Sequence, residues 1–342
     1  MAGVKDVAAR AGVSIGTVSN VINHPEAVSE EMRARVLKAM DELAFVPKSA
    51  AWHLRANRRP IIGLVVPNIS NPFFTEVACG VEEAAFASGY AVHLCHSDYN
   101  PDREDEHLRV LESQHVSAVL VTPIRESLEP LQRLLAHGVS VTLLGRDAHS
   151  GNVCSVSVDD RQGGYAAGRH VLALGHTRLL WLAGSDSVPV VSDREIGFMQ
   201  AVREARAVNP LVAVDRAAPD VATTTAGDET ITRLLLHDFP YTAIVCANDL
   251  LALGAMRALA RIGIDVPGDV SIVVYDDLDY AGSAMVPLTS VRQPMQDLGS
   301  EAVRLALQER HEASAHTHQH IVFQPKLIQR ASTARPRGDV VE

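Results

Sequence analysis

The sequence has few cysteines and lacks the signals of membrane proteins and of several large enzyme classes. Its four cysteines, Cys79, Cys95, Cys154 and Cys246, have neither disulfide nor metal-site spacing, which fits a reducing compartment. No signal peptide opens the sequence and no apolar run is long enough to cross a bilayer. We therefore expect a cytoplasmic protein without membrane contact. G-x-G-x-x-G and P-loop motifs are absent and no nucleophile–base pair is evident, so we expect neither an enzyme nor a cofactor.

Charge is distributed unevenly along the 342 residues, whose net charge is -10. Residues 1–60 contain nine Lys/Arg and six Asp/Glu, whereas the remainder contains 22 Lys/Arg and 35 Asp/Glu. A basic head on an acidic body favours contact with DNA at one end only. The length suits two or three domains with ample core.

Two short helical patterns flank Gly12, which permits a turn between them. Their apolar residues repeat at helical spacing, at Val4, Val7, Ala8 and Ala11 and then at Val18, Val21 and Ile22. Ser14 has the position of an N-cap, and the exposed face of the second pattern is small or polar. This layout predicts a helix-turn-helix whose second helix enters the DNA major groove. Two amphipathic helices packed together without any ligand are the alternative.

A third helical pattern follows, with Ser29 as its predicted N-cap and two glutamates in its first turn. Beyond Pro47 lies a short segment, residues 49–56. At this point the sequence resembles the LacI/GalR family of bacterial transcriptional regulators. The motifs that carry the resemblance are VKDVAARAGVS (4–14), TVSNVIN (17–23), PEAVSEEMRARV (25–36) and FVPKSAAWHL (45–54). Later motifs extend it, namely SNPFF (70–74), GHTRLLWLAG (175–184), ANDLLALGAMRAL (247–259), DVSIVVYDD (269–277) and LTSVRQP (288–294).

After the basic linker that ends at Pro60, apolar strands alternate with helices. This alternation predicts an α/β fold with parallel sheets covered on both faces. The resemblance implies a small all-α helix-turn-helix head and a hinge helix, joined to a two-lobed core like the periplasmic binding proteins. The expected domains are 1–47 (head), 48–60 (hinge and linker), 61–333 (core) and 334–342 (tail). Lobe one is expected at about 61–159 and 292–320, and lobe two at about 160–291 and 321–333.

Polar residues at strand ends mark a cleft between these lobes, because the carboxyl ends of parallel strands form the binding edge. Asp, Asn and Arg side chains read sugar hydroxyls, and an aromatic face suits a pyranose ring. The predicted effector contacts are Phe73, Phe74, Arg146, Arg194, Asn248 and Asp276. In relatives the residues matching the last three of these contact effectors. The alternative is that such residues only cap helices or form ion pairs. Gly145 stands where many relatives have an aspartate, and the apolar run at 188–191 replaces polar residues of purine-binding relatives. Both departures argue against a purine corepressor.

Four histidines near the end of the chain, His311, His316, His318 and His320, raise the question of a metal site. We expect none, because no thiol or carboxylate is spaced along the sequence to complete it. The resemblance further implies a homodimer that binds palindromic double-stranded operator DNA and responds to a small molecule, for which we expect a sugar or sugar derivative. A solute-binding protein of a sugar transporter is the alternative function. The predicted DNA contacts are Ser14, Ile15, Gly16, Thr17, Ser19, Asn20, Asn23 and, in the hinge, Leu54.

Overall fold

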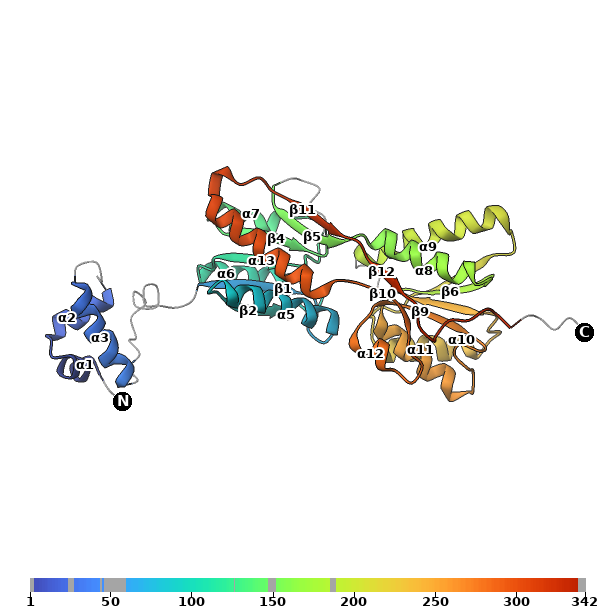
Figure 1. The fold of residues 1–342 in the computed structure, drawn as a ribbon, viewed down its shortest axis with the longest axis horizontal. Helices are drawn as coiled ribbons and strands as arrows, with labels where there is room; N and C mark the ends of the chain where they lie inside the picture. The colour runs from blue at the N-terminus through green and yellow to red at the C-terminus, as the bar shows by residue number, and fades with distance from the viewer. Residues whose placement is uncertain are drawn as a thin grey trace, which may run out of the picture. The chain divides into compact units, whose positions relative to one another are not determined.

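The computed structural model describes residues 3–23, 28–43, 45, 60–125, 127–146, 152–184 and 189–337 (Figure 1). The chain forms two compact units, residues 1–60 and residues 61–342. The predicted hinge segment 49–56, including Leu54, lies outside the described residues. Each unit is therefore considered by itself.

The described residues of the first unit form the helices α1 (Val4–Ala11), α2 (Ile15–Asn23) and α3 (Glu30–Glu42). Their apolar stripes meet in one small core, as the sequence predicts, with Val7, Val18 and Val36 fully buried. Gly12 ends α1 at a φ of 65°, a left-handed conformation that suits glycine. Arg35 of α3 donates to the carbonyl oxygen of Ala11 at 2.7 Å, which satisfies one of the free carbonyls at the end of α1.

The two predicted N-caps of this unit differ. Ser14 acts as expected, since its Oγ accepts a hydrogen bond from the Thr17 backbone N–H at 3.0 Å. Ser29 precedes α3 in extended backbone, but its side chain makes no capping hydrogen bond. The start of α3 therefore depends on Glu30 and Glu31, which interact favourably with the positive end of the helix dipole.

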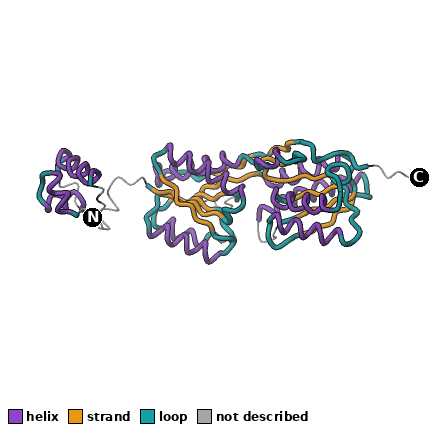
Figure 2. The backbone as a smooth tube through the Cα atoms, turned by 90° about the horizontal axis from the view of Figure 1, so that it is seen from below, coloured by secondary structure: helices purple, strands orange, loops and turns teal. Residues whose placement is uncertain are grey.

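The second unit is built on two six-stranded sheets, each with helices on both faces (Figure 2). The first sheet has the order β11-β5-β4-β3-β1-β2 and is parallel throughout. Its strands are β1 (Ile61–Val66), β2 (Ala91–His96), β3 (Ala118–Val121), β4 (Ser140–Leu144), β5 (Cys154–Val158) and β11 (His320–Phe323). The helices of this first lobe are α5 (Pro72–Ala87), α6 (Pro101–Ser113), α7 (Glu129–Ala136) and α13 (Met295–Glu312), followed by the 3-10 turn η2 (Ala313–Ala315).

The second sheet has the order β12-β10-β9-β8-β6-β7, and only the β10–β12 pair is antiparallel. Its strands are β6 (Arg178–Leu182), β7 (Ala213–Ala217), β8 (Ala243–Cys246), β9 (Ser271–Asp276), β10 (Thr289–Arg292) and β12 (Lys326–Ile328). The helices of this second lobe are α8 (Asp160–Ala173), α9 (Pro189–Val208), α10 (Thr224–Leu235), α11 (Asp249–Arg261) and α12 (Asp279–Ser283). The predicted α/β class is confirmed.

The predicted lobe boundaries are wrong at two places. Residues 321–323 were assigned to lobe two, yet β11 pairs with β5 in the first sheet, with Ile321 opposite Val156. The chain crosses to the second lobe only after Phe323, because β11 supplies the hydrogen-bond partners that β5 would otherwise lack at the edge. Arg292, assigned to lobe one, ends β10 in the second sheet.

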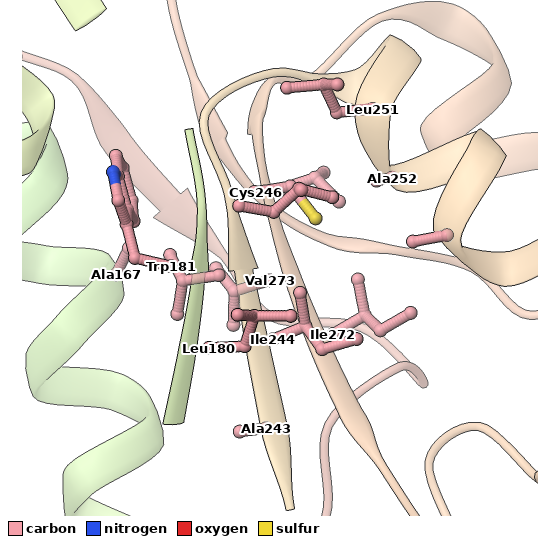
Figure 3. Close-up of a cluster of buried hydrophobic side chains, with 14 of the residues drawn as sticks. Ala167, Leu180, Trp181, Ala243, Ile244, Cys246, Leu251, Ala252, Ile272 and Val273 are labelled. Atoms are coloured by element: carbon pink, nitrogen blue, oxygen red, sulfur yellow. The ribbon is translucent and has the colours of Figure 1, made fainter. Parts of the chain in front are cut away.

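Buried side chains explain why the strands read as continuous apolar runs. Every residue of β3, β4, β5, β8 and β9 is buried, as expected for strands covered on both faces. In the second lobe Trp181 of β6 stacks on Phe198 of α9 with ring centroids 5.0 Å apart. Figure 3 shows Trp181 together with residues of β8 and β9 in this core. Within the described chain no helix is long and apolar enough to cross a membrane.

Three pairs of helices approach each other through glycines. A Cβ atom on Gly164 of α8 would lie 1.9 Å from the carbonyl oxygen of Arg194 in α9. The same close approach occurs between α5 and α13, at Gly80 and Gly299, and between α10 and α11, at Gly227 and Gly254. Because the obstructing atoms are backbone atoms, no side chain can move aside. The same kind of glycine contact therefore holds helix pairs together in both lobes. In the second lobe it fixes α9 against α8.

Candidate functional site

A cavity of about 180 Å3 is lined by residues of both lobes at the carboxyl ends of their strands. Its size suits a small molecule and not a polymer. The residues predicted from strand ends all line it: Phe73, Phe74, Arg146, Arg194, Asn248 and Asp276. The structure thus brings together side chains as far apart in the chain as Phe73 and Asp276.

The first lobe contributes a mainly apolar wall. Asn71 caps α5 by accepting a hydrogen bond from the Phe73 N–H at 3.0 Å, and Pro72 occupies the first turn. This cap places Phe73 and Phe74 at the start of the helix, where their rings pack edge to face with centroids 5.1 Å apart. Arg146 follows β4 and donates from Nη1 to the carbonyl oxygen of Arg125 at 2.7 Å. We call the pair Phe73 and Phe74 the aromatic wall.

The second lobe contributes buried charge, centred on Arg194 of α9. Its Nε donates to Oδ1 of Asp160 at 2.7 Å, and its Nη1 donates to the Ala247 carbonyl oxygen at 2.7 Å. Nη1 also lies 3.4 Å from Oδ1 of Asp276, and the guanidinium is 3.8 Å from the centroid of the Tyr275 ring. We call Asp160, Arg194, Asn248 and Asp276 the ionic wall.

Burial and charge act in opposite directions on the pKa values of this wall. Burial raises the pKa of Asp160 and of Asp276 above the usual carboxyl range, and the Arg194 guanidinium offsets part of that rise. Burial alone would lower the pKa of Arg194, but the two carboxylates raise it overall. Arg194 is therefore a permanent cation, and its charge favours the ionised form of the two buried aspartates.

Asn248 and Asp276 each have one polar atom already committed to the protein. Asn248 Oδ1 caps α11 by accepting from the Leu251 N–H at 3.0 Å, which leaves its amide NH2 as a donor. Asp276 Oδ1 accepts from Gln293 Nε2 at 2.6 Å, which leaves Oδ2 as an acceptor among the described residues. Asp276 and Asp277 have φ values of 101° and 64°, a strained backbone of the kind that collects at binding sites.

Asp277 holds this strained turn in place through two arginines. Arg292 donates to its Oδ2 at 2.6 Å, and Arg330 donates to both of its oxygens. The Asp277 side chain is only 2% exposed, so its carboxylate is shielded from water while it accepts these charge-assisted hydrogen bonds. Asp276 is consequently fixed toward the cavity.

Several lining residues are absent from the sequence-based prediction, namely Asn71, Tyr99, Asp160, Asp220 and Gln293. Asp160 follows β5, a strand in which serines alternate with apolar residues, so no continuous apolar run marks it in the sequence. Gln293 lies within the LTSVRQP motif, but its role depends on its contact with Asp276. The alternative reading, that strand-end residues cap helices or form ion pairs, is also correct for Asn248 and Arg194. They do both, because they line the cavity as well.

In the first unit α2 presents most of its predicted contact residues to the surface. Ser14, Ile15, Gly16, Ser19 and Asn20 are exposed, and Thr17 is half-buried. Ile15 is 49% exposed, which is unusual for a large aliphatic residue beside a buried stripe. Ser14 and Thr17 share a hydrogen bond between their hydroxyls at 2.8 Å. The side chain of Asn23, like Leu54, lies outside the described residues.

Two family models match this chain. Residues 3–48 match the bacterial regulatory proteins of the lacI family, and residues 59–329 match the periplasmic binding proteins and sugar binding domain of the LacI family. The chain belongs to the LacI family. It is a DNA-binding transcriptional regulator, and its core matches the sugar binding domain of that family.

Relatives and solved structures of this family cover almost the whole chain. The transcriptional regulator DegA of Bacillus subtilis is 35% identical over 336 residues, 97% of this chain and 98% of the relative. The cellobiose complex of the regulator CelR is 29% identical, with a TM-score of 0.71 over 97% of this chain and all of that one. A LacI family regulator from Enterococcus faecium with bound ribose is 27% identical, with a TM-score of 0.74 over 81% of this chain and all of that one.

Proposed function

We propose that this regulator is a cytoplasmic homodimeric repressor that releases or binds a palindromic operator when a sugar occupies the cavity. The observation that carries the proposal is the pairing of an aromatic wall with a donor and an acceptor that remain available in the ionic wall. A sugar hydroxyl both donates and accepts, so the Asn248 amide and Asp276 Oδ2 suit neighbouring hydroxyls. Phe73 and Phe74 suit the C–H face of a sugar ring.

Two related structures support a sugar as the ligand class. Ribose is bound in the Enterococcus faecium regulator and cellobiose in CelR. A thermal-shift screen of sugars, polyols and nucleosides identifies the effector here, because a ligand that binds the folded state raises its melting temperature. A stabilising nucleoside and no stabilising sugar would overturn the assignment.

The donor role of Asn248 is tested once a sugar has been found. Asn248→Ala removes the amide donor and should weaken that sugar by about tenfold at most, since one hydrogen bond contributes roughly 0.5–1.5 kcal/mol. The same change also removes a helix cap. Asn100→Ala is the matched control, because Asn100 caps α6 with its side-chain oxygen and does not line the cavity. Equal losses of affinity in both variants, measured by calorimetry, would contradict the role of Asn248.

On DNA, we expect Ile15, Gly16 and Asn20 to face base edges, while Ser14, Thr17, Ser19 and Asn23 bind the phosphate backbone. Asn20 suits adenine and Ile15 suits a thymine methyl. Asn20→Ala should therefore change base preference by about 1–3 kcal/mol at one base pair of each half-site. Ser19→Ala should weaken all sequences equally. A uniform loss for Asn20→Ala, measured against a library of half-sites, would contradict base reading.

A dimer follows from the small footprint of one recognition helix, which contacts too few bases alone. Light scattering should give a dimer at micromolar concentration.

In the hinge, Leu54 is proposed to insert into the minor groove at the operator centre and kink the duplex. Leu54→Ala should then reduce operator bending while effector binding is unchanged. Unaltered bending in a circular-permutation assay would exclude the wedge.

Catalysis is not part of the proposal. The run Gly12–Gly16 has the spacing G-x-S-x-G of a hydrolase nucleophile turn, but it joins two helices where that turn requires a strand and a helix. The alternative, a solute-binding protein of a transporter, gives no role to residues 3–48, which match a regulator head. Salt-dependent binding to palindromic DNA separates the two, because counterion release accompanies phosphate contacts.

A further inference from the structure

Away from the cavity, four metal-ligating side chains of the first lobe converge. They are Cys154 at the start of β5, Glu309 near the end of α13, and His316 and His318 in the segment that leads to β11. One ligand atom from each lies within 4.8 Å of the other three. Figure 1 shows α13, β5 and β11 in the same lobe. The cavity lies at the opposite ends of these strands, where Val158 closes β5.

The distances within this cluster suit one tetrahedral ion. Ligand atoms on a tetrahedral Zn2+ lie about 3.3–3.8 Å apart, given bond lengths of about 2.0–2.3 Å. Cys154 Sγ lies 3.2 Å from His316 Nε2 and 3.8 Å from His318 Nδ1. Only small side-chain movements would therefore place all four ligand atoms on one ion.

Neighbouring groups orient these ligands as they do in metal sites. Glu312 Oε2 is 2.9 Å from Nδ1 of His316, which directs Nε2 of that ring toward Cys154. The Gln319 N–H donates to Cys154 Sγ at 3.4 Å, a contact that favours a thiolate. In the described part of the chain Glu309 Oε2 is buried without a hydrogen-bond partner, which is costly unless a ligand binds there.

We propose that Cys154, Glu309, His316 and His318 form a Zn2+ site that fastens the end of α13 and the following segment to β5. One thiolate, two imidazoles and a carboxylate are the donors that zinc prefers in proteins. The sequence spacing alone had predicted no metal site here. Cys154 and His318 are 164 residues apart in sequence, so spacing could not show their contact. Of the other two histidines, His320 contacts Ser155 and His311 is exposed.

A nucleophilic cysteine with a histidine base is the competing use of such a pair. Cys154 is fully buried. A nucleophile needs a thiolate that a substrate can reach, so this burial opposes that use. A metal requires no access for a substrate.

Cobalt spectroscopy on the untagged full-length protein tests the proposal. After removal of metal with a chelator, one equivalent of Co2+ should give a thiolate-to-cobalt charge-transfer band and the visible bands of a tetrahedral ion. One equivalent of Zn2+ should abolish both. Cys154→Ser should remove the charge-transfer band, and Glu309→Gln should weaken Co2+ binding at least tenfold.

Cys95→Ser is the matched control, since Cys95 is the other buried thiol of the first lobe and is outside the cluster. It should leave the cobalt spectrum unchanged. Circular dichroism establishes that each variant is folded. The proposal is overturned if the parent gives no charge-transfer band, if the band survives Cys154→Ser, or if Cys95→Ser removes it in a folded protein. Those results would leave an ordinary thiol–imidazole hydrogen bond in the core.

Discussion

The two walls of the cavity are built by different physical means although the two lobes share one architecture. The aromatic wall consists of rings at the start of α5, which contact their neighbours through dispersion and apolar burial. The ionic wall is a network in which Arg194 bonds to Asp160 and the Ala247 carbonyl and lies beside Asp276. Apolar contacts tolerate partial loss, whereas a buried charge without its partner is strongly unfavourable.

Because of this difference, the two walls should contribute unequally to ligand affinity and to the stability of the fold. Changes in the aromatic wall should alter how well a ligand binds and leave the fold nearly unchanged. Loss of the Arg194 charge from the ionic wall should lower the stability of the second lobe strongly, because two buried carboxyls lose their cation. Variants of the aromatic wall should therefore lose more affinity than stability, and removal of Arg194 should cost more stability than affinity.

The largest loss of stability is expected for Arg194→Met. It leaves the buried carboxyls of Asp160 and Asp276 without their cation, so the free energy of unfolding should fall by about 3–5 kcal/mol. Arg109→Met is the control in the first lobe, where Arg109 pairs with Glu106 on the exposed face of α6 and a loss of less than about 1 kcal/mol is expected. Urea unfolding measures both. Similar losses in the two variants would show that the ionic wall carries no special share of stability.

The next largest loss of stability is expected at the glycine contacts between helices, and it should be similar in the two lobes. Gly254→Ala and Gly299→Ala each place a Cβ near a backbone oxygen, at 2.1 Å from Thr224 and 2.2 Å from Val77 respectively. Each should destabilise by about 1–3 kcal/mol or more, because a helix must shift, despite a gain of roughly 1 kcal/mol in helix propensity. Thermal unfolding measures both. A stabilised variant would mean that its helix pair separates without cost, and the two lobes would then differ in packing as well as in their walls.

Much of this architecture was predictable because it depends on local patterns. Continuous apolar strands such as β8 and β9, and the cap before Phe73, are visible in the chain. β7 was missed because it is an edge strand with alternating partial exposure and no apolar run. The partners of Arg194 and the cluster around Cys154 were also missed. Both depend on contacts between residues distant in sequence, which only the sheet order brings together.

A pH series distinguishes the buried carboxyls of the second lobe. Burial and the neighbouring Asp276 raise the pKa of Asp249, so its stabilising contribution is complete below about pH 4 and is lost as the pH rises through that raised pKa. Asp249→Asn should therefore lessen the fall in unfolding free energy with rising pH. The amide oxygen can keep the bond that Oδ2 accepts from the Leu278 N–H.

Asp228→Asn is the control of opposite sign. Hydrogen bonds from Arg261 and Arg257 lower the pKa of Asp228 to about 2, so its contribution is present above about pH 4 and is lost as the pH falls toward 2. This variant should be less stable at neutral pH and should keep the parent's dependence between about pH 5 and 8. If Asp249→Asn showed the parent's dependence as well, Asp249 would not be a source of it. The two aspartates of the ionic wall, Asp160 and Asp276, would then account for the fall in unfolding free energy with rising pH.

The smallest effect is expected in the aromatic wall, and it is seen in binding alone. Phe73→Leu and Phe74→Leu keep an apolar residue at the start of α5 but remove the face on which a sugar ring packs. Each should reduce the binding free energy of the sugar found by thermal shift by about 0.5–1.5 kcal/mol, which is at most roughly tenfold in affinity. Each should also lower the free energy of unfolding less than Arg194→Met does. Calorimetric titration gives the affinity and urea unfolding gives the stability of the same preparation. If stability fell and affinity did not, the rings would serve the core of the first lobe, and the contrast between the two walls would fail.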